Sequence, residues 1–471
     1  MDHSGRIPYL VRKGFVGPVW TTPATARLVE ILWNDSVRLM KEEAEWRTRK
    51  AVRRGLPPVV PLYDEKDVDK ALKLLRPTDW DTETAAVDGV SFSLHDAGHI
   101  LGSSSIAFKL SEGDRATRLV FSGDLGQQFP AVDRAPSAIR EADYVLIEST
   151  YGDRLHKDDA ATREEFRSVI LTALKDRGKV LIPSFVVDRA QRLLFELSLM
   201  QIEGLLPEIP IFFDSPMGVR ATELYRTYGD TLSGEVRRHA AAGVDLFSPK
   251  GFRSVSTPEE SQKINDVPFG IVIAGSGMCT GGRIVHHLKH GAWNPRNHIV
   301  FVGYQAYGTL GRRIVDGETE LRIAGEDVVV KARVHTIGGF SAHGDRDDLL
   351  AWAGHYTTNP LFFVTHGEPK ASQAFSAALR ERGMRGIVPA LGQEFSIEPG
   401  ASVATMEAEA KPAAAARTPQ AEIPGVLDDI ERLLERLRRD EGALADSEES
   451  RRLLLSARTS LESALRGKTA P

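Results

Sequence analysis

Four side chains able to bind a metal or transfer a proton lie in short segments rich in small residues. They are His99 in HDAGHILGS, Asp124 in VFSGDLG, His343 in SAHGD and His366 in FVTHGE. Each stands in a turn or at the end of an apolar strand, where α/β folds gather functional groups. The neighbouring glycines permit close approach of a ligand. Histidine and carboxylate ligands without a thiolate favour zinc in a hydrolytic site that keeps a position open for water.

A further pair of this kind, Asp2 and His3, stands at the start of the sequence. Chain ends fray unless they are tied down, so an isolated terminal pair would make a poor metal site. The pair is therefore either accidental or the end of a longer motif. Each of the four internal residues alone would more often be structural, but all of them in such contexts predict a functional site.

The elements that would position these residues follow two patterns. Short β-rich runs separated by turns fill residues 87–150. Residues 162–334 alternate apolar strands with helices, which predicts a largely parallel sheet. Thr22 and Pro23 predict the capped start of a long helix. Residues 403–471 read as a linker followed by two amphipathic segments, 426–439 and 447–466, which predict a helical hairpin that docks or forms a homodimer.

Bulk composition narrows the class of protein. The 471 residues carry a formal charge of -5, so the overall charge gives no sign of nucleic-acid binding. A local basic groove is compatible with this net charge. With Cys279 as the single cysteine, no internal disulfide can form, and a reducing compartment is the simplest interpretation. No apolar run reaches 18 residues. We expect a cytoplasmic protein that does not bind membranes.

The segment AGSGMCTGGR is a glycine-rich turn between an apolar strand and a helix. Backbone N–H groups in such a turn can hold a phosphate, although the segment alone fits a plain tight turn equally well. The candidate phosphate ligands are Ser276, Gly277, Gly281 and Arg283. Three histidines follow at positions 286, 287 and 290, and a solvated or RNA-facing cluster is favoured there over a metal-binding pair.

These motifs resemble the metallo-β-lactamase-fold nucleases that carry a β-CASP insertion, such as RNase J and the endonuclease of the pre-mRNA 3′-end cleavage machinery. The first family signature is His-x-His-x-Asp-His, and Met1, Asp2 and His3 match its last three positions. ESTYGDR supplies an acidic residue, Glu148, and further matches are IPSFVVDRAQ, FDSPM, GSGMCTGGR and GYQAYGTLGRR. The resemblance covers residues 1 to about 400 and favours phosphate binding by the glycine-rich turn.

The resemblance implies an α/β fold: a metallo-β-lactamase αββα sandwich, split and missing its first strands, with an inserted α/β β-CASP domain. The implied boundaries are 1–155 and 335–402 for the two parts of the lactamase domain and 156–334 for the β-CASP domain. We expect the codons upstream of Met1 to encode the missing His-x-His. Asp188 departs from the family, which usually has glycine there, and could cap the following helix.

The resemblance also implies roles for individual residues. Asp2, His3 and His366 would bind one zinc ion, His99 would bind a second, and Asp124 would bridge the two. Activated water would attack the phosphorus, with Asp2 among the catalytic residues. His343, held near Glu148, would protonate the leaving sugar oxygen. The family site holds two zinc ions, and we expect about one here because two histidine ligands precede the sequence given.

The resulting hypothesis is a zinc-dependent ribonuclease that hydrolyses RNA phosphodiester bonds. Two alternatives stay open. One is a catalytically impaired RNA-binding protein that lacks one metal site. The other is a small-molecule hydrolase on the lactamase fold, against which ESTYG, SAH and THGE around a long α/β insertion argue.

Overall fold

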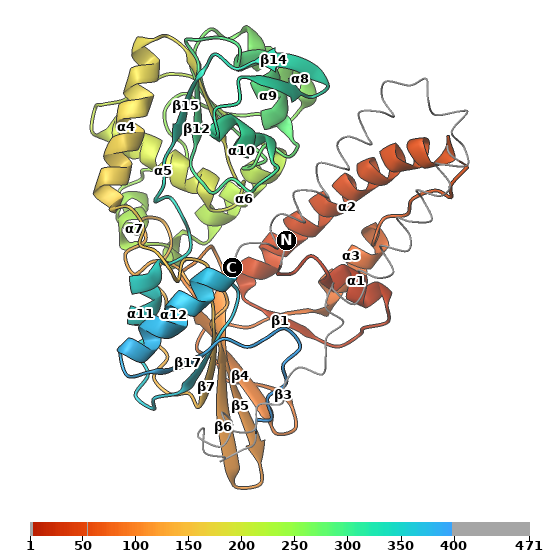
Figure 1. Ribbon diagram of the computed structural model, residues 1–471, viewed down its shortest axis with the longest axis vertical. Coiled ribbons are helices and arrows are strands. Elements are labelled where there is room, and N and C mark those ends of the chain that lie inside the picture. The colour runs from red at the N-terminus through yellow and green to blue at the C-terminus, as the bar shows by residue number, and fades with distance from the viewer. Residues whose placement is uncertain (1–2, 54, 398–471) are drawn as a thin grey trace, which may run out of the picture. The chain divides into compact units, whose positions relative to one another are not determined.

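The computed structural model describes residues 3–53 and 55–397 (Figure 1). The chain divides into two compact units, and all the elements below belong to the unit that contains residues 1–389. Asp2, the whole predicted linker and both predicted hairpin segments lie outside the described residues. The homodimer inferred from the hairpin therefore stays a prediction.

A seven-stranded sheet joins two distant parts of the chain. Its order is β17-β16-β7-β6-β5-β4-β3, and the strands β3 to β6 form an antiparallel meander. β7 pairs in parallel with both β6 and β16, so residues 144–147 lie beside residues 361–364. In Figure 1 the blue β17 accordingly lies at one side of the orange strands, on the side of β7. The strands are β3 Thr84–Val87, β4 Val90–Asp96, β5 Ser104–Glu112, β6 Arg115–Phe121, β7 Tyr144–Ile147, β16 Leu361–Val364 and β17 Arg385–Ile387.

Two helices cover one face of this sheet. They are α11 (Arg346–Ala353) and α12 (Pro369–Glu381), and their side chains Trp352 and Phe375 belong to one buried cluster with Val145 of β7. Asp345 caps α11 through its carboxylate, which accepts hydrogen bonds from the backbone N–H groups of residues 347 and 348. This cap fixes where the segment that contains His343 ends and the helix begins.

A second, six-stranded sheet has the order β10-β9-β11-β8-β12-β15, and every pairing in it is parallel, as predicted. Alternate residues of its strands face two separate cores, so helices cover both faces. β15 ends at Thr336, so the predicted boundary at residue 334 falls inside this strand. The strands are β8 Lys179–Pro183, β9 Ile211–Asp214, β10 Phe252–Ser254, β11 Gly270–Ala274, β12 His298–Phe301 and β15 Arg333–Thr336.

The helices of this region alternate with its strands (Figure 1). They are α4 Asp159–Lys175, α5 Arg189–Ile202, α6 Pro216–Thr227, α7 Gly234–Ala241, α8 Pro258–Lys263, α9 Arg283–Gly291 and α10 Leu310–Val315. α4 and α5 pack on one face of the sheet, and α9 and α10 pack on the other. A small hairpin, β13 (Glu320–Ile323) with β14 (Glu326–Val329), joins the second core.

The N-terminal elements are α1 (Ile7–Arg12), α2 (Pro23–Val52) and α3 (Glu65–Leu74), with β1 (Val19–Thr21) paired to β2 (Leu75–Pro77). The capped start predicted for the long helix is confirmed, because the Thr22 hydroxyl accepts a hydrogen bond from the Thr25 N–H at 3.2 Å. Among the described helices, none combines the length and the apolar character that a membrane span requires.

Candidate metal centre

The predicted ligands converge because of the strand directions in the seven-stranded sheet. β4, β6, β7 and β16 run parallel to one another, since two antiparallel steps restore the direction from β4 to β6. Their carboxyl ends therefore meet at one edge of the sheet. His99 follows β4, Asp124 follows β6, Glu148 follows β7 and His366 follows β16. His343 reaches the same edge from the segment before α11.

The Asp124 carboxylate is the centre of this group. His3 Nε2 lies 3.1 Å from Oδ2, His366 Nδ1 lies 3.4 Å from Oδ1, and His99 Nε2 lies 3.8 Å from Oδ2. Two overlapping sets result, His3–Asp124–His366 and His99–Asp124–His343, and in each set the possible ligand atoms lie within 4.8 Å of one another. We call His3, His99, Asp124, His343 and His366 the Asp124 cluster.

The electrostatics of the cluster suit a cation. Burial raises the pKa of the Asp124 carboxyl, but the hydrogen bond from His3 and the charges of His99 and His343 outweigh burial and lower that pKa to about 2. Burial, reinforced by the charge of His343, lowers the pKa of the His99 imidazole to about 4. Asp124 is thus ionised and His99 neutral near pH 7, the states that bind a metal. The donor set of imidazoles and a carboxylate fits a divalent ion such as zinc.

Glu148 holds His343 in place. The His343 Nδ1 atom lies 3.1 Å from Glu148 Oε1, which also accepts a hydrogen bond from the Leu125 N–H at 2.6 Å. The other oxygen of this buried carboxylate accepts from the Thr150 N–H at 3.2 Å. Burial lowers the pKa of His343, but the hydrogen bond to Glu148 and its charge outweigh burial and raise that pKa above its usual value. A histidine with a raised pKa can act as a general acid.

Two supporting residues were missed by the sequence analysis. His156 Nε2 donates to the His343 carbonyl at 2.9 Å, and the His156 N–H donates to Asp345 Oδ2 at 2.9 Å. The Tyr151 ring centroid lies 4.6 Å from that of His156 and 6.1 Å from that of His343. Tyr151 lies inside ESTYGDR and could have been named from that motif. His156 carries no local signal, because its partners lie almost 190 residues away.

Gly126 sets the distance between the loops that carry His99 and Asp124. Its N–H donates to the Ala97 carbonyl at 2.9 Å, and a Cβ built on it would lie 1.7 Å from the Gly98 carbonyl oxygen. A side chain there would force the two loops apart.

We therefore expect Gly126→Ala to lower the free energy of unfolding by about 1–3 kcal/mol or more, because backbone atoms must shift to admit the methyl group. Gly229→Ala is the matched control, since its Cβ would meet nothing within 4 Å. Denaturant unfolding of both variants measures the difference. Equal stability of the two would show that the loops approach each other less closely than described.

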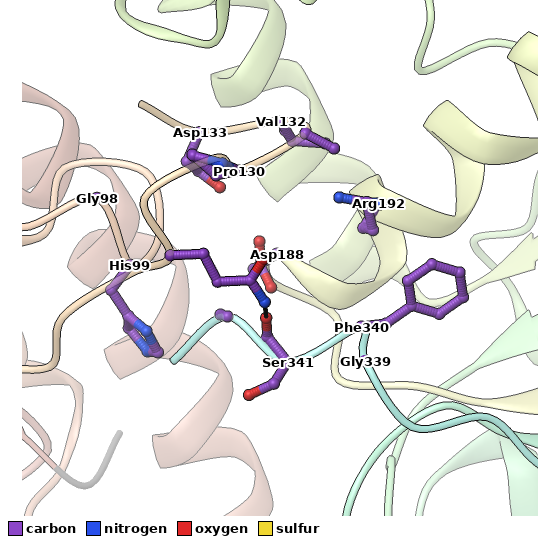
Figure 2. A pocket seen from close by; sticks show the side chains of 13 residues that line it. Gly98, His99, Pro130, Val132, Asp133, Asp188, Arg192, Gly339, Phe340 and Ser341 are labelled. Carbon is purple, nitrogen blue, oxygen red and sulfur yellow. Dashed lines mark hydrogen bonds between the residues drawn. The ribbon is translucent and has the colours of Figure 1, made fainter. Parts of the chain in front are cut away.

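A small recess of about 30 Å³ lies beside His99, and Figure 2 shows His99, Asp188 and Arg192 around it. It has room for a few water molecules. Asp188 adopts φ +67°, a conformation that favours glycine, and its carboxyl hydrogen-bonds to Asp133. Burial raises the pKa of both carboxyls, so the pair shares a proton. The helix-capping role predicted for Asp188 is wrong, because its side chain makes no cap hydrogen bond.

The glycine-rich turn lies between β11 and α9 in the six-stranded sheet. Arg283 donates to Asp214, to the Ser256 carbonyl at 2.8 Å and to the Val255 carbonyl at 3.2 Å. Its guanidinium is thus committed to protein partners. Ser276 Oγ accepts from the Thr280 N–H at 3.0 Å. In the described part of the chain, no hydrogen bond or ion pair joins this turn to the Asp124 cluster. Phosphate binding by Ser276, Gly277, Gly281 and Arg283 stays a prediction.

The histidines of α9 divide into two kinds. His287 is buried, and its Nε2 lies 2.7 Å from Asp214 Oδ2. The predicted solvated or RNA-facing role is therefore wrong for His287. The ring centroids of His286 and His290 lie 4.5 Å apart.

Cys279 is buried, and burial raises its pKa to about 12, which agrees with a packed residue rather than a nucleophile.

Comparison with known proteins adds independent information. Residues 190–314 match the family described as "Beta-Casp domain", and residues 327–389 match "Zn-dependent metallo-hydrolase RNA specificity domain". The chain is 40% identical over 395 residues to "Ribonuclease TTHA0252" of Thermus thermophilus, an alignment that covers 83% of this chain and 85% of that protein.

Archaeal proteins are similar as well. The chain is 35% identical over 393 residues to "Transcription termination factor FttA" of Thermococcus kodakarensis, covering 81% of this chain and 58% of that protein. For the protein of the same name from Methanocaldococcus jannaschii, the identity is 34% over 390 residues, with 81% and 59% covered. The chain thus spans somewhat more than half the length of these archaeal relatives.

Proposed function

The chain belongs to the β-CASP family of metallo-β-lactamase-fold ribonucleases, and on that basis we propose that it hydrolyses RNA phosphodiester bonds at the Asp124 cluster. The family assignment supports an RNA-cleaving metallo-hydrolase. The single observation that supports the location of the site is the convergence of one ionised carboxylate with three imidazoles at one sheet edge.

We propose zinc as the metal, because imidazole and carboxylate donors without thiolate are typical of hydrolytic zinc sites. His3, Asp124 and His366 would hold one ion, to which Asp2 would add a ligand, and we expect about one tightly held zinc in this chain. His99 would contact a second position that shares Asp124. When bound, such an ion lowers the pKa of water and stabilises negative charge on phosphodiester oxygens.

Glu148 and His343 position and transfer a proton. Glu148, fixed by the N–H groups of Leu125 and Thr150, accepts a hydrogen bond from His343 Nδ1. The imidazolium of His343 is thereby stabilised and oriented. We propose that His343 gives its proton to the sugar oxygen that leaves as the P–O bond breaks and water adds to the phosphorus. The imidazole then recovers a proton from solvent.

The substrate class is tested by offering the purified protein labelled single-stranded RNA, DNA of the same sequence, and a chromogenic small ester or lactam. We expect cleavage of RNA that stops when a chelator is added. RNA binding without cleavage, in protein reconstituted with zinc, would favour the RNA-binding alternative. Hydrolysis of the small ester or lactam with intact RNA would favour the small-molecule alternative. Either result would contradict the proposed function.

A further inference from the structure

We propose that Phe185, Tyr304 and Tyr307 form a surface on which unpaired RNA bases stack. The inference rests on the proposed ribonuclease function and adds to it a way of recognising single-stranded substrate. The residues follow two neighbouring strands of the six-stranded sheet, Phe185 after β8 and both tyrosines after β12. We call these three side chains the aromatic surface.

All three rings are exposed in the structure. Tyr307 is 93% exposed, Tyr304 is 58% exposed and Phe185 is 48% exposed. Large aromatic side chains favour burial, so a group of them left open to water marks an interaction site. Successive bases stack on such rings in proteins that bind single strands, and the contact tolerates any sequence because every base has a π face.

The loops that carry the aromatic surface are held together by one buried side chain. Gln305, between the two tyrosines, donates from Nε2 to the Gly277 carbonyl at 2.9 Å and to the Gly303 carbonyl at 3.1 Å. A Cβ on Gly277 would lie 2.9 Å from the Phe185 ring, so this ring packs closely on the glycine-rich turn. The loops after β8, β11 and β12 are therefore held together before RNA binds. Binding then costs less conformational entropy of the protein.

The electrostatics of this sheet edge favour a polyanion. α5, α6 and α9 each follow a parallel strand, after connections of five, one and eight residues, so their amino termini lie toward the edge that carries the aromatic surface. Each amino terminus contributes a partial positive charge. Arg312 lies near Tyr304, and its Nε donates to both carboxylate oxygens of Asp316 at 2.8 and 2.9 Å. Exposed rings beside positive potential suit bases attached to phosphates better than an apolar protein segment.

The aromatic surface also connects to the Asp124 cluster. Arg189 donates from Nη1 to the Val302 carbonyl, two residues before Tyr304. Arg189 also lies near Tyr151, whose ring centroid lies 6.1 Å from that of His343. A strand of RNA that is cut beside His343 would therefore reach the aromatic surface by crossing Tyr151 and Arg189.

The test compares oligouridine with an abasic ribose-phosphate oligomer of the same length, because only the first can stack. Fluorescence anisotropy in the presence of a chelator measures each Kd without cleavage. We expect Tyr304→Leu and Tyr307→Leu each to weaken oligouridine binding about 5- to 150-fold and to leave abasic binding nearly unchanged. Leucine keeps an apolar side chain and removes the π face. Thermal unfolding checks that the variants fold.

Trp293→Leu is the matched control. Trp293 is 57% exposed and follows α9 before β12, so it lies at the opposite edge of the same sheet. We expect this variant to bind both oligomers as the parent does. Parental oligouridine binding by Tyr304→Leu and Tyr307→Leu would overturn the inference, as would an equal loss for both oligomers. A parent that neither binds nor cuts RNA would instead overturn the proposed function.

Discussion

Replacing Asp124 with asparagine is expected to abolish metal retention and to reduce RNA cleavage by more than about 100-fold. Loss of a residue that only supports a ligand commonly costs 10- to 100-fold, and Asp124 belongs to both possible ligand sets. An asparagine keeps the shape but not the charge, so three imidazoles lose their anionic partner. Metal analysis after dialysis and a cleavage time course measure the two effects.

Asp143→Asn is the matched control for this prediction. Asp143 lies just before β7, at the edge of the seven-stranded sheet opposite the cluster, and its carboxylate accepts from the Arg118 N–H. An asparagine oxygen can replace that acceptor. We expect this variant to keep its metal and its cleavage rate. If Asp124→Asn behaved in the same way, the cluster would not be the metal centre.

His343→Ala is expected to reduce RNA cleavage by about 10²–10⁴-fold while the metal content stays nearly unchanged. The reason is that His343 is hydrogen-bonded to Glu148, whereas His366 contacts Asp124 directly. His366→Ala should therefore lose metal and activity together. Single-turnover cleavage, a filter-binding measurement and a metal count on both variants separate the two roles.

Glu148→Gln tests how much of the role of His343 depends on the charge of Glu148. A glutamine oxygen can still accept the hydrogen bond from His343 Nδ1, but it no longer stabilises the imidazolium by charge. We expect a smaller loss of cleavage than for His343→Ala. The contrary outcome has a structural basis, because His343 also lies within 4.8 Å of the possible ligand atoms of His99 and Asp124. If His343→Ala lost metal in step with activity, His343 would be a ligand and not the acid.

The strand-end pattern of the sequence was sufficient to bring several candidate site residues together. His99, Asp124 and His366 each follow an apolar strand, and parallel strand directions bring the strand ends to one edge, where Glu148, which only the family resemblance indicated, also lies. The parallel β-CASP sheet was predictable from a second local pattern. Its strands are continuously apolar because both faces of the sheet are covered. These features depend on local pattern and on the general geometry of sheets.

Features that depend on distant partners could not be predicted. The buried carboxylate of Asp214 binds Arg283 and His287, about 70 residues further along the chain, and this contact removes His287 from the surface role predicted for it. His156 supports His343 across a similar kind of long-range contact. Asp188 turns toward Asp133 instead of capping α5, because its backbone adopts a left-handed conformation that no local pattern revealed.

The most direct measurement of the central claim follows metal content and RNA cleavage together in one preparation. The parent protein is stripped with a chelator, dialysed and titrated with zinc, and each point is assayed for bound zinc and for the initial rate of cleavage of labelled RNA. We predict that the stripped protein is inactive and that activity returns in proportion to zinc bound at the Asp124 cluster, with no recovery in Asp124→Asn. Undiminished cleavage by the metal-free protein, or full recovery in Asp124→Asn, would contradict the account.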